Sequence, residues 1–198
     1  MDNSLSTTTL PATTRTAKAA VTRQRILNAA EEVVVRDGVG RLTLEATAAE
    51  AGLSKGGVLY HFPSRDALVT GMVERFVGDF SHEIARATEG SDEPGSFTGA
   101  YVRATVAPAS AEPDRDNRLG AALIAAVAAE PALLRPLRSA FDHWQAQLET
   151  DGIDPVRATV LRLAADGLWL CELFGLAPLA PARRQAVGDE LQRLVRNP

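Results

Sequence analysis

The sequence predicts an all-α protein, with a small N-terminal domain of three helices followed by a larger helical C-terminal domain. Apolar residues recur three and four positions apart through most of the chain, which is the spacing of one face of an α-helix. Proline, glycine, serine and threonine interrupt this pattern where helices would start and end. No segment shows the alternation of apolar and polar residues that a half-buried strand needs.

Composition limits the classes of function. At 198 residues the chain can bury an adequate core, and its single cysteine, Cys171, excludes an intramolecular disulfide. No apolar run approaches the ~20 residues of a membrane span, and the N-terminus lacks the apolar core of a secretory signal. We therefore expect a cytoplasmic protein without a membrane partner.

The charges are unevenly distributed. Basic residues number 21 and acidic residues 25, and the net charge of −4 by itself argues against a nucleic-acid partner. Residues 15–65, however, carry eight basic and five acidic side chains, whereas the remainder from residue 66 carries 13 and 19. A local excess of positive charge is expected in a segment that touches phosphates.

The chain is expected to begin with a mobile tail and a first helix. Residues 1–20 are rich in serine and threonine, so we interpret them as a disordered tail. Arg15 and Lys18 could reach phosphates; a solvated tail without a role is the alternative. Thr22 is expected to cap a helix that ends at Gly38. Its apolar stripe consists of Ile26, Leu27, Ala30, Val33 and Val34.

Two short helices joined by a tight turn follow. Thr43 is a good N-cap for the first of them, and Gly52 ends it because glycine adopts a positive φ at little cost. Ser54 caps the second helix, residues 55–61, and Pro63 stops it. We expect the inward-facing side chains of the second helix to be Val58, Leu59 and Phe62. The outward-facing residues are then Lys55, Gly56, Tyr60 and His61.

This pair is a helix-turn-helix, whose second helix lies in the major groove of DNA. The start of that helix at Gly56 and Gly57 has no side chains, so its backbone can approach DNA closely and its free N–H groups favour a phosphate. Lys55 can donate to guanine, whereas Tyr60 and His61 fit phosphate contacts. The alternative is a solvent-exposed helix with an incidental Tyr-His pair.

Other residues at helix starts suit contacts with the DNA backbone. They are Thr43, Ser54 and Arg65. Glu45 lies near the same face and would repel phosphate unless it accepts a hydrogen bond from a cytosine amine. We therefore expect double-stranded DNA as the partner of this segment.

The core of the segment, LSKGGVLYHFPSRDAL, resembles the DNA-binding domain of TetR-family transcriptional regulators, and the resemblance extends over residues 22–73. The Tyr-His-Phe ending and the capped helix that follows are more specific than a generic helix-turn-helix. Thr47 and Arg65 depart from the usual family residues, but Thr47 keeps a β-branched shape and can return its hydroxyl to the carbonyl of Thr43. The resemblance implies a regulator that is not an enzyme.

The rest of the chain is expected to be helical. Ser64 should start a long helix that reaches about Thr88 and links the two domains. Pro136 should cause a kink or a restart, because its ring is incompatible with a helix interior. The expected helices are residues 97–106, 118–129, 131–150, 155–174 and 181–195, with loops at 89–99 and 108–116. We place the DNA-binding domain at residues 21–66 and an effector-binding and dimerisation domain at residues 67–198.

The last two helices are too apolar for a small monomer, so they need a further cover. The resemblance implies that they pair across a two-fold axis in a homodimer. Two recognition helices of such a dimer meet major grooves ~34 Å apart, so the DNA operator should be an inverted repeat. The candidate interface residues are Leu161, Ala165, Leu168, Val187, Leu191 and Leu194.

The resemblance also implies a cavity for a small-molecule effector, whose identity the sequence does not give. The candidate lining residues are Phe76, Phe80, Tyr101, Phe141, Trp144, Trp169, Glu172 and Phe174. Ordinary core packing is the alternative for each aromatic residue. Asp166 and Glu172 need partners if they are buried, either an arginine of the other subunit or a cationic ligand.

Signs of catalysis are missing from the sequence. It has no Cys, His and carboxylate cluster at metal-ligand spacing, no nucleophile–base pair and no phosphate-cradling loop. We expect no metal, no cofactor and no catalytic residue. The preferred interpretation is a repressor that a small molecule releases from DNA; the alternative is an all-α ligand-binding protein or enzyme with a vestigial helix-turn-helix.

Overall fold

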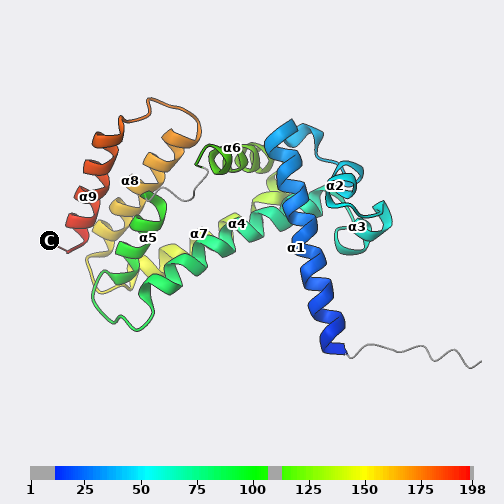
Figure 1. Ribbon diagram of the computed structural model, residues 1–198. Coiled ribbons are helices and arrows are strands. Elements are labelled where there is room, and N and C mark those ends of the chain that lie inside the picture. Colours follow the sequence, from blue (N-terminus) through cyan, green and yellow to red (C-terminus); the bar gives the residue numbers. More distant parts are fainter. Residues whose placement is uncertain (1–11, 107–112, 197–198) are drawn as a thin grey trace, which may run out of the picture. The chain divides into compact units, whose positions relative to one another are not determined.

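The computed structural model describes residues 12–106 and 113–196, and in these ranges every regular element is a helix (Figure 1). The chain divides into two compact units, one up to Leu68 and one from Val69. The boundary falls inside helix α4 (Arg65–Thr88), so one continuous helix belongs to both units. In the described ranges, no helix combines the length and the apolar character that crossing a membrane requires.

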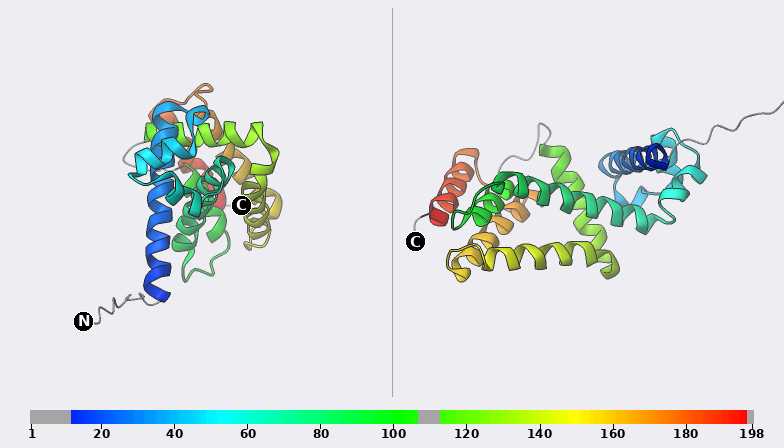
Figure 2. Two further views of the ribbon diagram at one scale, coloured as in Figure 1. Left: turned by 90° about the vertical axis from the view of Figure 1, so that its right-hand side faces the viewer. Right: turned by 90° about the horizontal axis from the view of Figure 1, so that it is seen from below.

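The first unit consists of α1 (Ala12–Asp37), a short 3-10 helix η1 (Val39–Arg41), α2 (Leu44–Ala51), α3 (Lys55–His61) and the start of α4. α1 extends well past the α2–α3 pair (Figure 2). From residue 16 onward, the first buried side chain of α1 is Ile26, and most of the residues between them are exposed. The core is formed mainly by Ile26, Leu27, Val33, Leu42, Ala48 and Val58.

The local signals of the helix-turn-helix are confirmed. The side chains of Thr43 and Ser54 each accept a hydrogen bond from the backbone amide three residues further on, at 3.0 Å and 3.1 Å. Gly52 ends α2 with a φ of +61°, which the lack of a Cβ atom allows. Thr47 is fully buried and donates its hydroxyl to the carbonyl of Thr43 at 2.9 Å, so this departure from the family pattern is accommodated without an unpaired polar group.

The predicted start of the first helix is wrong. Thr22 lies inside α1, where its hydroxyl donates to the carbonyl of Lys18 at 2.9 Å instead of capping the helix. Alanine and long basic residues are strong helix formers, and over residues 12–20 they outweigh the threonines that suggested a tail. The predicted disordered tail is thus replaced by helix from Ala12 onward, and residues 1–11 lie outside the described part of the chain.

The predicted inward face of α3 needs one correction. Val58 and Phe62, four residues apart, are buried as predicted. Leu59 is instead 39% exposed, because it lies about 100° around the helix from Val58 and a helix of two turns buries only one face. Leu59 is therefore an apolar residue on the side of α3 that points away from the core.

The second unit contains the rest of α4 and six further helices in its described residues. These are α5 (Ser96–Val106), α6 (Pro113–Ala129), η2 (Pro131–Leu134), α7 (Arg135–Glu149), α8 (Pro155–Leu173) and α9 (Pro181–Arg196). The predicted restart is confirmed, since Pro136 lies in the first turn of α7 directly after η2. The predicted loop 108–116 is wrong at its end, where α6 already begins at Pro113; residues 107–112 are outside the described ranges.

Two clusters of buried side chains hold the second unit together. α5, α8 and α9 lie side by side (Figure 1) and share an aliphatic cluster of Val102, Val106, Leu161, Ala165, Leu191 and Val195. α4, α5 and α7 share an aromatic cluster centred on Tyr101 and Trp144, with Phe80 and Phe141 packed against it. The two clusters meet along α5, which contributes to both.

Asp151 fixes the start of α5 although it lies 54 residues further along the chain than Phe97. Its carboxylate accepts hydrogen bonds from the backbone amides of Phe97 and Thr98 at 3.0 Å and 2.7 Å, and from the hydroxyl of Thr98 at 2.7 Å. Its own carbonyl accepts from the amide of Gly95 at 2.7 Å. Because Thr98 is fully buried, this carboxylate satisfies donors that water cannot reach.

Candidate functional site

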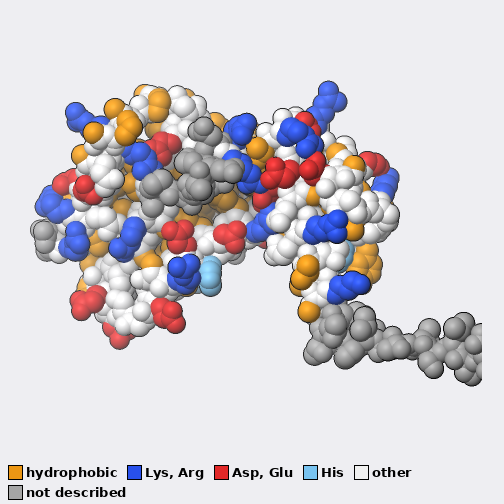
Figure 3. All heavy atoms as spheres, in the orientation of Figure 1, with side chains coloured by type: hydrophobic (Ala, Val, Ile, Leu, Met, Phe, Trp, Pro, Cys, Tyr) orange, Lys and Arg blue, Asp and Glu red, His pale blue; other side chains and the backbone are white. Residues whose placement is uncertain are grey.

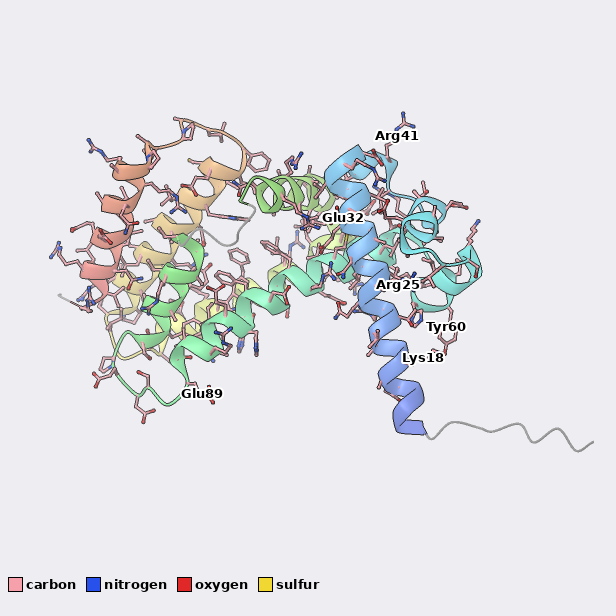
Figure 4. All side chains as sticks on the ribbon, viewed as in Figure 1. Lys18, Arg25, Glu32, Arg41, Tyr60 and Glu89 are labelled. Atoms are coloured by element: carbon pink, nitrogen blue, oxygen red, sulfur yellow. The ribbon has the colours of Figure 1, made fainter. Side chains whose placement is uncertain are left out.

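The outer face of α3 carries most of the predicted DNA-contacting side chains. Tyr60 is 83% exposed and points away from the helices of its unit (Figure 4). The His61 ring packs edge-on against the Tyr60 ring, with 5.1 Å between the ring centroids, and is half-buried. Lys55 and Gly56 are exposed on the same helix. The predicted outward residues therefore share one surface, with His61 positioned behind Tyr60.

The glycines at the start of α3 are not required by packing inside the unit. A Cβ atom at Gly56 would meet no atom closer than Ser54 Oγ at 4.0 Å. At Gly57 the nearest atom would be the same Oγ at 3.4 Å, an ordinary contact. Glycine lowers the stability of a helix, so two of them in the first turn have no structural advantage here, and they leave the backbone of α3 bare.

Lys55 forms an ion pair across the helix-turn-helix. Its Nζ atom lies 2.5 Å from a carboxylate oxygen of Glu45, which is in the first turn of α2. Both side chains are more than half exposed. The hydrogen bond from Lys55 lowers the pKa of the Glu45 carboxyl below its usual value. The pair joins the start of α2 to the start of α3 on the outer surface.

The guanidinium group of Arg65 makes two contacts within its own unit. One guanidinium nitrogen donates to the carbonyl of Val39 at 3.0 Å, and another lies 3.7 Å from a carboxylate oxygen of Asp66. The side chain remains about two-fifths exposed, so it can still face an external anion. The hydroxyl oxygens of Thr43 and Ser54 accept the cap hydrogen bonds, and each O–H group can still donate to an external acceptor.

The basic residues of α1 lie on the same unit. Arg23 stacks its guanidinium over the ring of Phe62, with 5.0 Å between them, and Arg25 reaches toward Gly52. Lys18 is exposed on the part of α1 that extends beyond α2 and α3 (Figure 4). No acidic residue occurs between Ala12 and Ala30. This stretch of helix is therefore uniformly positive.

The predicted dimer residues need a correction. Leu161, Ala165 and Leu191 are buried inside the protomer against α5, so they are not available to a second copy. Leu168, Val187 and Leu194 pack against the same cluster. Both faces of α8 are apolar in the sequence, and only the position of α5 shows which of them is covered within the protomer.

The exposed face of α8 is also apolar. Its large exposed side chains are Val156, Val160, Leu163, Leu170 and Phe174, and Gly167 lies between them in the same row. Leu176 and Leu179 continue the exposed apolar surface into the α8–α9 connection, where Figure 3 shows hydrophobic side chains gathered. Most monomeric proteins do not expose a continuous apolar row of this length.

The predicted pocket aromatics form a packed core. Phe80 packs edge-on against Tyr101 and Trp144, at centroid distances of 5.3 Å and 4.9 Å, and Phe141 lies 5.1 Å from Trp144. Phe76 stacks with Trp169 at 6.2 Å. Phe174 is exposed at the end of α8. Phe80, Tyr101, Phe141 and Trp144 therefore pack as ordinary core residues, which was the alternative to a role in lining a pocket.

A small cavity adjoins Phe76. Its volume is about 10 Å³, enough for one water at most, and its lining is apolar. The lining residues are Val73, Phe76, Gly120, Leu123, Ile124, Val127 and Leu137. A shallow groove of about 500 Å³ lies elsewhere on the unit, lined by Asn117, Arg118, Ala121, Glu172 and Leu173. Among the predicted pocket residues, Phe76 and Glu172 therefore border open space.

Both acidic residues of α8 have partners in their own chain. Asp166 accepts hydrogen bonds from Tyr101 at 2.8 Å and from Arg162 at 2.9 Å. Glu172 is paired with Arg184, which donates to both of its carboxylate oxygens. The predicted partners, an arginine of another subunit or a cationic ligand, are thus replaced by arginines of the same chain.

Cys171 is half-buried near the end of α8. In residues 12–106 and 113–196, no group of three or more His, Cys, Asp or Glu side chains lies close enough together to hold a metal ion.

Two family models cover most of the chain. Residues 26–72 match the bacterial regulatory proteins of the tetR family, and residues 95–196, just over half of the chain, match the tetracyclin repressor-like C-terminal domain. The chain belongs to the TetR family. The first match contains the whole helix-turn-helix, and the second runs from the start of α5 to the end of α9.

Curated relatives of this TetR-family chain are similar over short segments. The transcriptional regulator TtgR of Pseudomonas putida is 36% identical over 72 residues, which are 36% of this chain and 34% of TtgR. SrpR of Pseudomonas putida is 50% identical over 46 residues, or 23% of this chain and 22% of SrpR. The matched segments thus span about a third of TtgR and about a fifth of SrpR.

Solved structures are similar over nearly the whole chain. A TetR-family member from Streptomyces coelicolor A3 is 26% identical, with a TM-score of 0.68 over 87% of this chain and 97% of that one. The multidrug binding protein EbrR in complex with ethidium is also 26% identical, with a TM-score of 0.66 over 87% of this chain and 98% of EbrR. The fold of this chain is therefore that of TetR-family proteins over most of its length.

Proposed function

We propose that this protein is a sequence-specific DNA-binding transcriptional regulator, and specifically a repressor that a small molecule releases from an inverted-repeat operator. The observation that carries the proposal is the outer face of α3. There, Lys55, Tyr60 and a bare glycine backbone are exposed together on a helix whose start is fixed by the Ser54 cap. A helix with these features fits a major groove, with lysine as a base reader and tyrosine as a phosphate contact.

A homodimer would supply the second recognition helix. The exposed apolar row of α8 supports this assembly, because its members are alternately four and three residues apart, as in helices that pack along a seam. These residues are Val156, Val160, Leu163, Gly167, Leu170 and Phe174. Gly167 has no atom within 4 Å of the position of a Cβ, so another helix could approach closely at this point. A second copy of α8 is the partner that we propose for this row.

The effector site that we propose is an enlargement of the cavity beside Phe76. Gly120 lies in its wall, and a Cβ atom there would come within 2.9 Å of Leu173, so α6 and α8 are already in close contact. A ligand must therefore separate these helices to enter. The apolar lining and the neighbouring Trp169 favour a flat aromatic molecule, and EbrR has been solved with ethidium.

Release from DNA requires only that the effector binds one conformation of the dimer better than the other. A ligand that prefers the non-binding conformation by ~100-fold shifts the equilibrium by about 2.7 kcal/mol, enough to empty an operator.

The DNA-binding proposal is tested by fluorescence anisotropy with DNA from beside the gene and with scrambled DNA of equal length, at several salt concentrations. We expect at least ~10³-fold tighter binding to one sequence, and a large loss of this ratio in Lys55→Ala. Lys18→Ala is the matched control, because it removes the same charge outside α3 and should leave the ratio unchanged. Equal binding to all sequences, including those from a random-sequence selection, would contradict the proposal.

Effector binding is tested with Trp144→Phe, which leaves Trp169 as the remaining tryptophan of the chain. In the absence of DNA, we expect ethidium to quench its fluorescence. Unchanged Trp169 fluorescence at saturating ethidium would contradict the proposed effector site.

A further inference from the structure

The ion pair between Glu45 and Lys55 is unexpected on a surface that meets DNA. A carboxylate next to phosphates weakens binding, yet Glu45 is exposed at the start of α2 and directed at the one lysine of α3. The two residues come from different helices, but the Thr43 and Ser54 caps fix the start of each helix. The position of the pair is therefore well defined.

Stability of the fold does not account for this pair. Exposed ion pairs contribute little to folding, because solvent screens the charges and ordering two long side chains costs entropy. The packing of α2 against α3 is provided by buried residues, including Ala48, Ala51 and Val58. The helix-turn-helix would keep its shape without Glu45.

The pair has the hydrogen-bonding pattern that a G·C base pair requires. In the major groove, guanine presents the acceptors O6 and N7, and the cytosine beside it presents the N4 amine as a donor. Lys55 supplies donors and Glu45 supplies acceptors, and the two groups are already adjacent at 2.5 Å. We propose that Glu45 and Lys55 act together as the reader of one G·C base pair, with Lys55 donating to guanine and Glu45 accepting from the N4 amine of its cytosine.

This proposal rests on the proposed function, since it assigns a specificity to the same recognition surface. It differs from a role of Lys55 alone in one respect. A lone lysine can bind guanine or a phosphate, whereas a carboxylate gains a partner only where a cytosine amine is present and is repelled by phosphates elsewhere. Glu45 should therefore lower the affinity for non-specific DNA and raise the discrimination at one position of each half-site.

The test compares Glu45→Ala with the matched variant Glu50→Ala. Both remove one negative charge from α2, but Glu50 lies five residues further along, about 140° around the helix, where it pairs with Arg36 at 2.7 Å. A random-sequence selection with the wild-type protein first identifies the operator. Anisotropy then measures the full-length wild type and both variants against that operator, against versions with each G·C pair changed to A·T, and against non-specific DNA.

For the wild type, we expect about a tenfold loss or more when one particular G·C pair is changed. In Glu45→Ala this loss should fall below about threefold at that position and stay unchanged at the others, while non-specific binding becomes tighter. Glu50→Ala should keep the wild-type pattern. An unchanged preference in Glu45→Ala, or an equal change in both variants, would overturn the reading of the base pair by Glu45. A wild-type protein that selects no sequence would overturn the proposed function itself.

Discussion

Tyr101 donates its hydroxyl to a carboxylate oxygen of Asp166 at 2.8 Å and so connects α5 to α8. Arg162, one turn before Asp166, donates to the other carboxylate oxygen at 2.9 Å and lies over the ring of Phe141. Tyr101 is 1% exposed and belongs to the aromatic cluster. The Asp166 carboxyl group is thus held inside the second unit by two specific donors.

Asp166 should make the stability of the protein depend on pH. Burial raises the pKa of its carboxyl above 3.8, more than the bonds from Tyr101 and Arg162 lower it. The folded protein therefore holds this proton more tightly than the unfolded chain does. The resulting stabilisation is fully present below about pH 3.8 and is lost as the pH rises through the higher folded-state pKa.

Asp166→Asn keeps an acceptor for Tyr101 and removes this titration. As the pH rises from about 4 to about 7, the free energy of unfolding in urea should decrease less, or increase more, for Asp166→Asn than for the wild type. Asp142→Asn, which removes an exposed carboxylate from α7, serves as the control. Identical pH profiles for the wild type and Asp166→Asn would show that Asp166 does not titrate in this way.

Asp151→Ala should destabilise the protein by about 2–3 kcal/mol, because it leaves the buried donors at the start of α5 without an acceptor. Asp154→Ala removes an ordinary N-cap, that of α8, and should cost only about 1 kcal/mol. Urea unfolding monitored by circular dichroism measures both. Equal losses would mean that Asp151 acts only as a common cap.

Gly167→Ala should stabilise the protomer and weaken the proposed dimer. Alanine is favoured over glycine in a helix by about 1 kcal/mol, and no atom within the protomer opposes a Cβ at this position. Gly78→Ala in α4 offers the same gain at an exposed position outside the row on α8. Sedimentation equilibrium should show a higher dissociation constant for Gly167→Ala alone. Unchanged association would remove Gly167 from the interface.

The N-terminal turns of α1 should add a sequence-independent contribution to DNA affinity. This stretch is uniformly positive, and most of its residues from 16 to 25 are exposed. We expect Lys18→Ala to weaken specific and non-specific DNA to the same degree, and to reduce the slope of log affinity against log salt by about one. Arg86→Ala, at the end of α4, is the charge-matched control and should leave the slope unchanged.

The sequence was informative wherever a feature depended on near neighbours in the chain. The Thr43 and Ser54 caps, the Gly52 helix end and the restart at Pro136 were all predicted correctly, because each involves atoms only a few residues apart. The same kind of prediction from near neighbours failed for Thr22. Its hydroxyl can either accept from a backbone amide as an N-cap or donate to a backbone carbonyl within a helix. There, the helix propensity of the surrounding alanines decided between them.

The sequence by itself determined most of the helices and the caps at Thr43, Ser54 and Asp154, because local hydrogen bonding and apolar spacing are encoded within single segments. Only the tertiary structure decided which apolar face of α8 is buried, since α5 covers Leu161 and leaves Leu163 exposed. It also decided that Asp166 pairs with Tyr101 and that Asp151 caps α5, more than fifty residues away. Such pairings depend on how helices pack, and the spacing of residues within one helix carries no information about its neighbours.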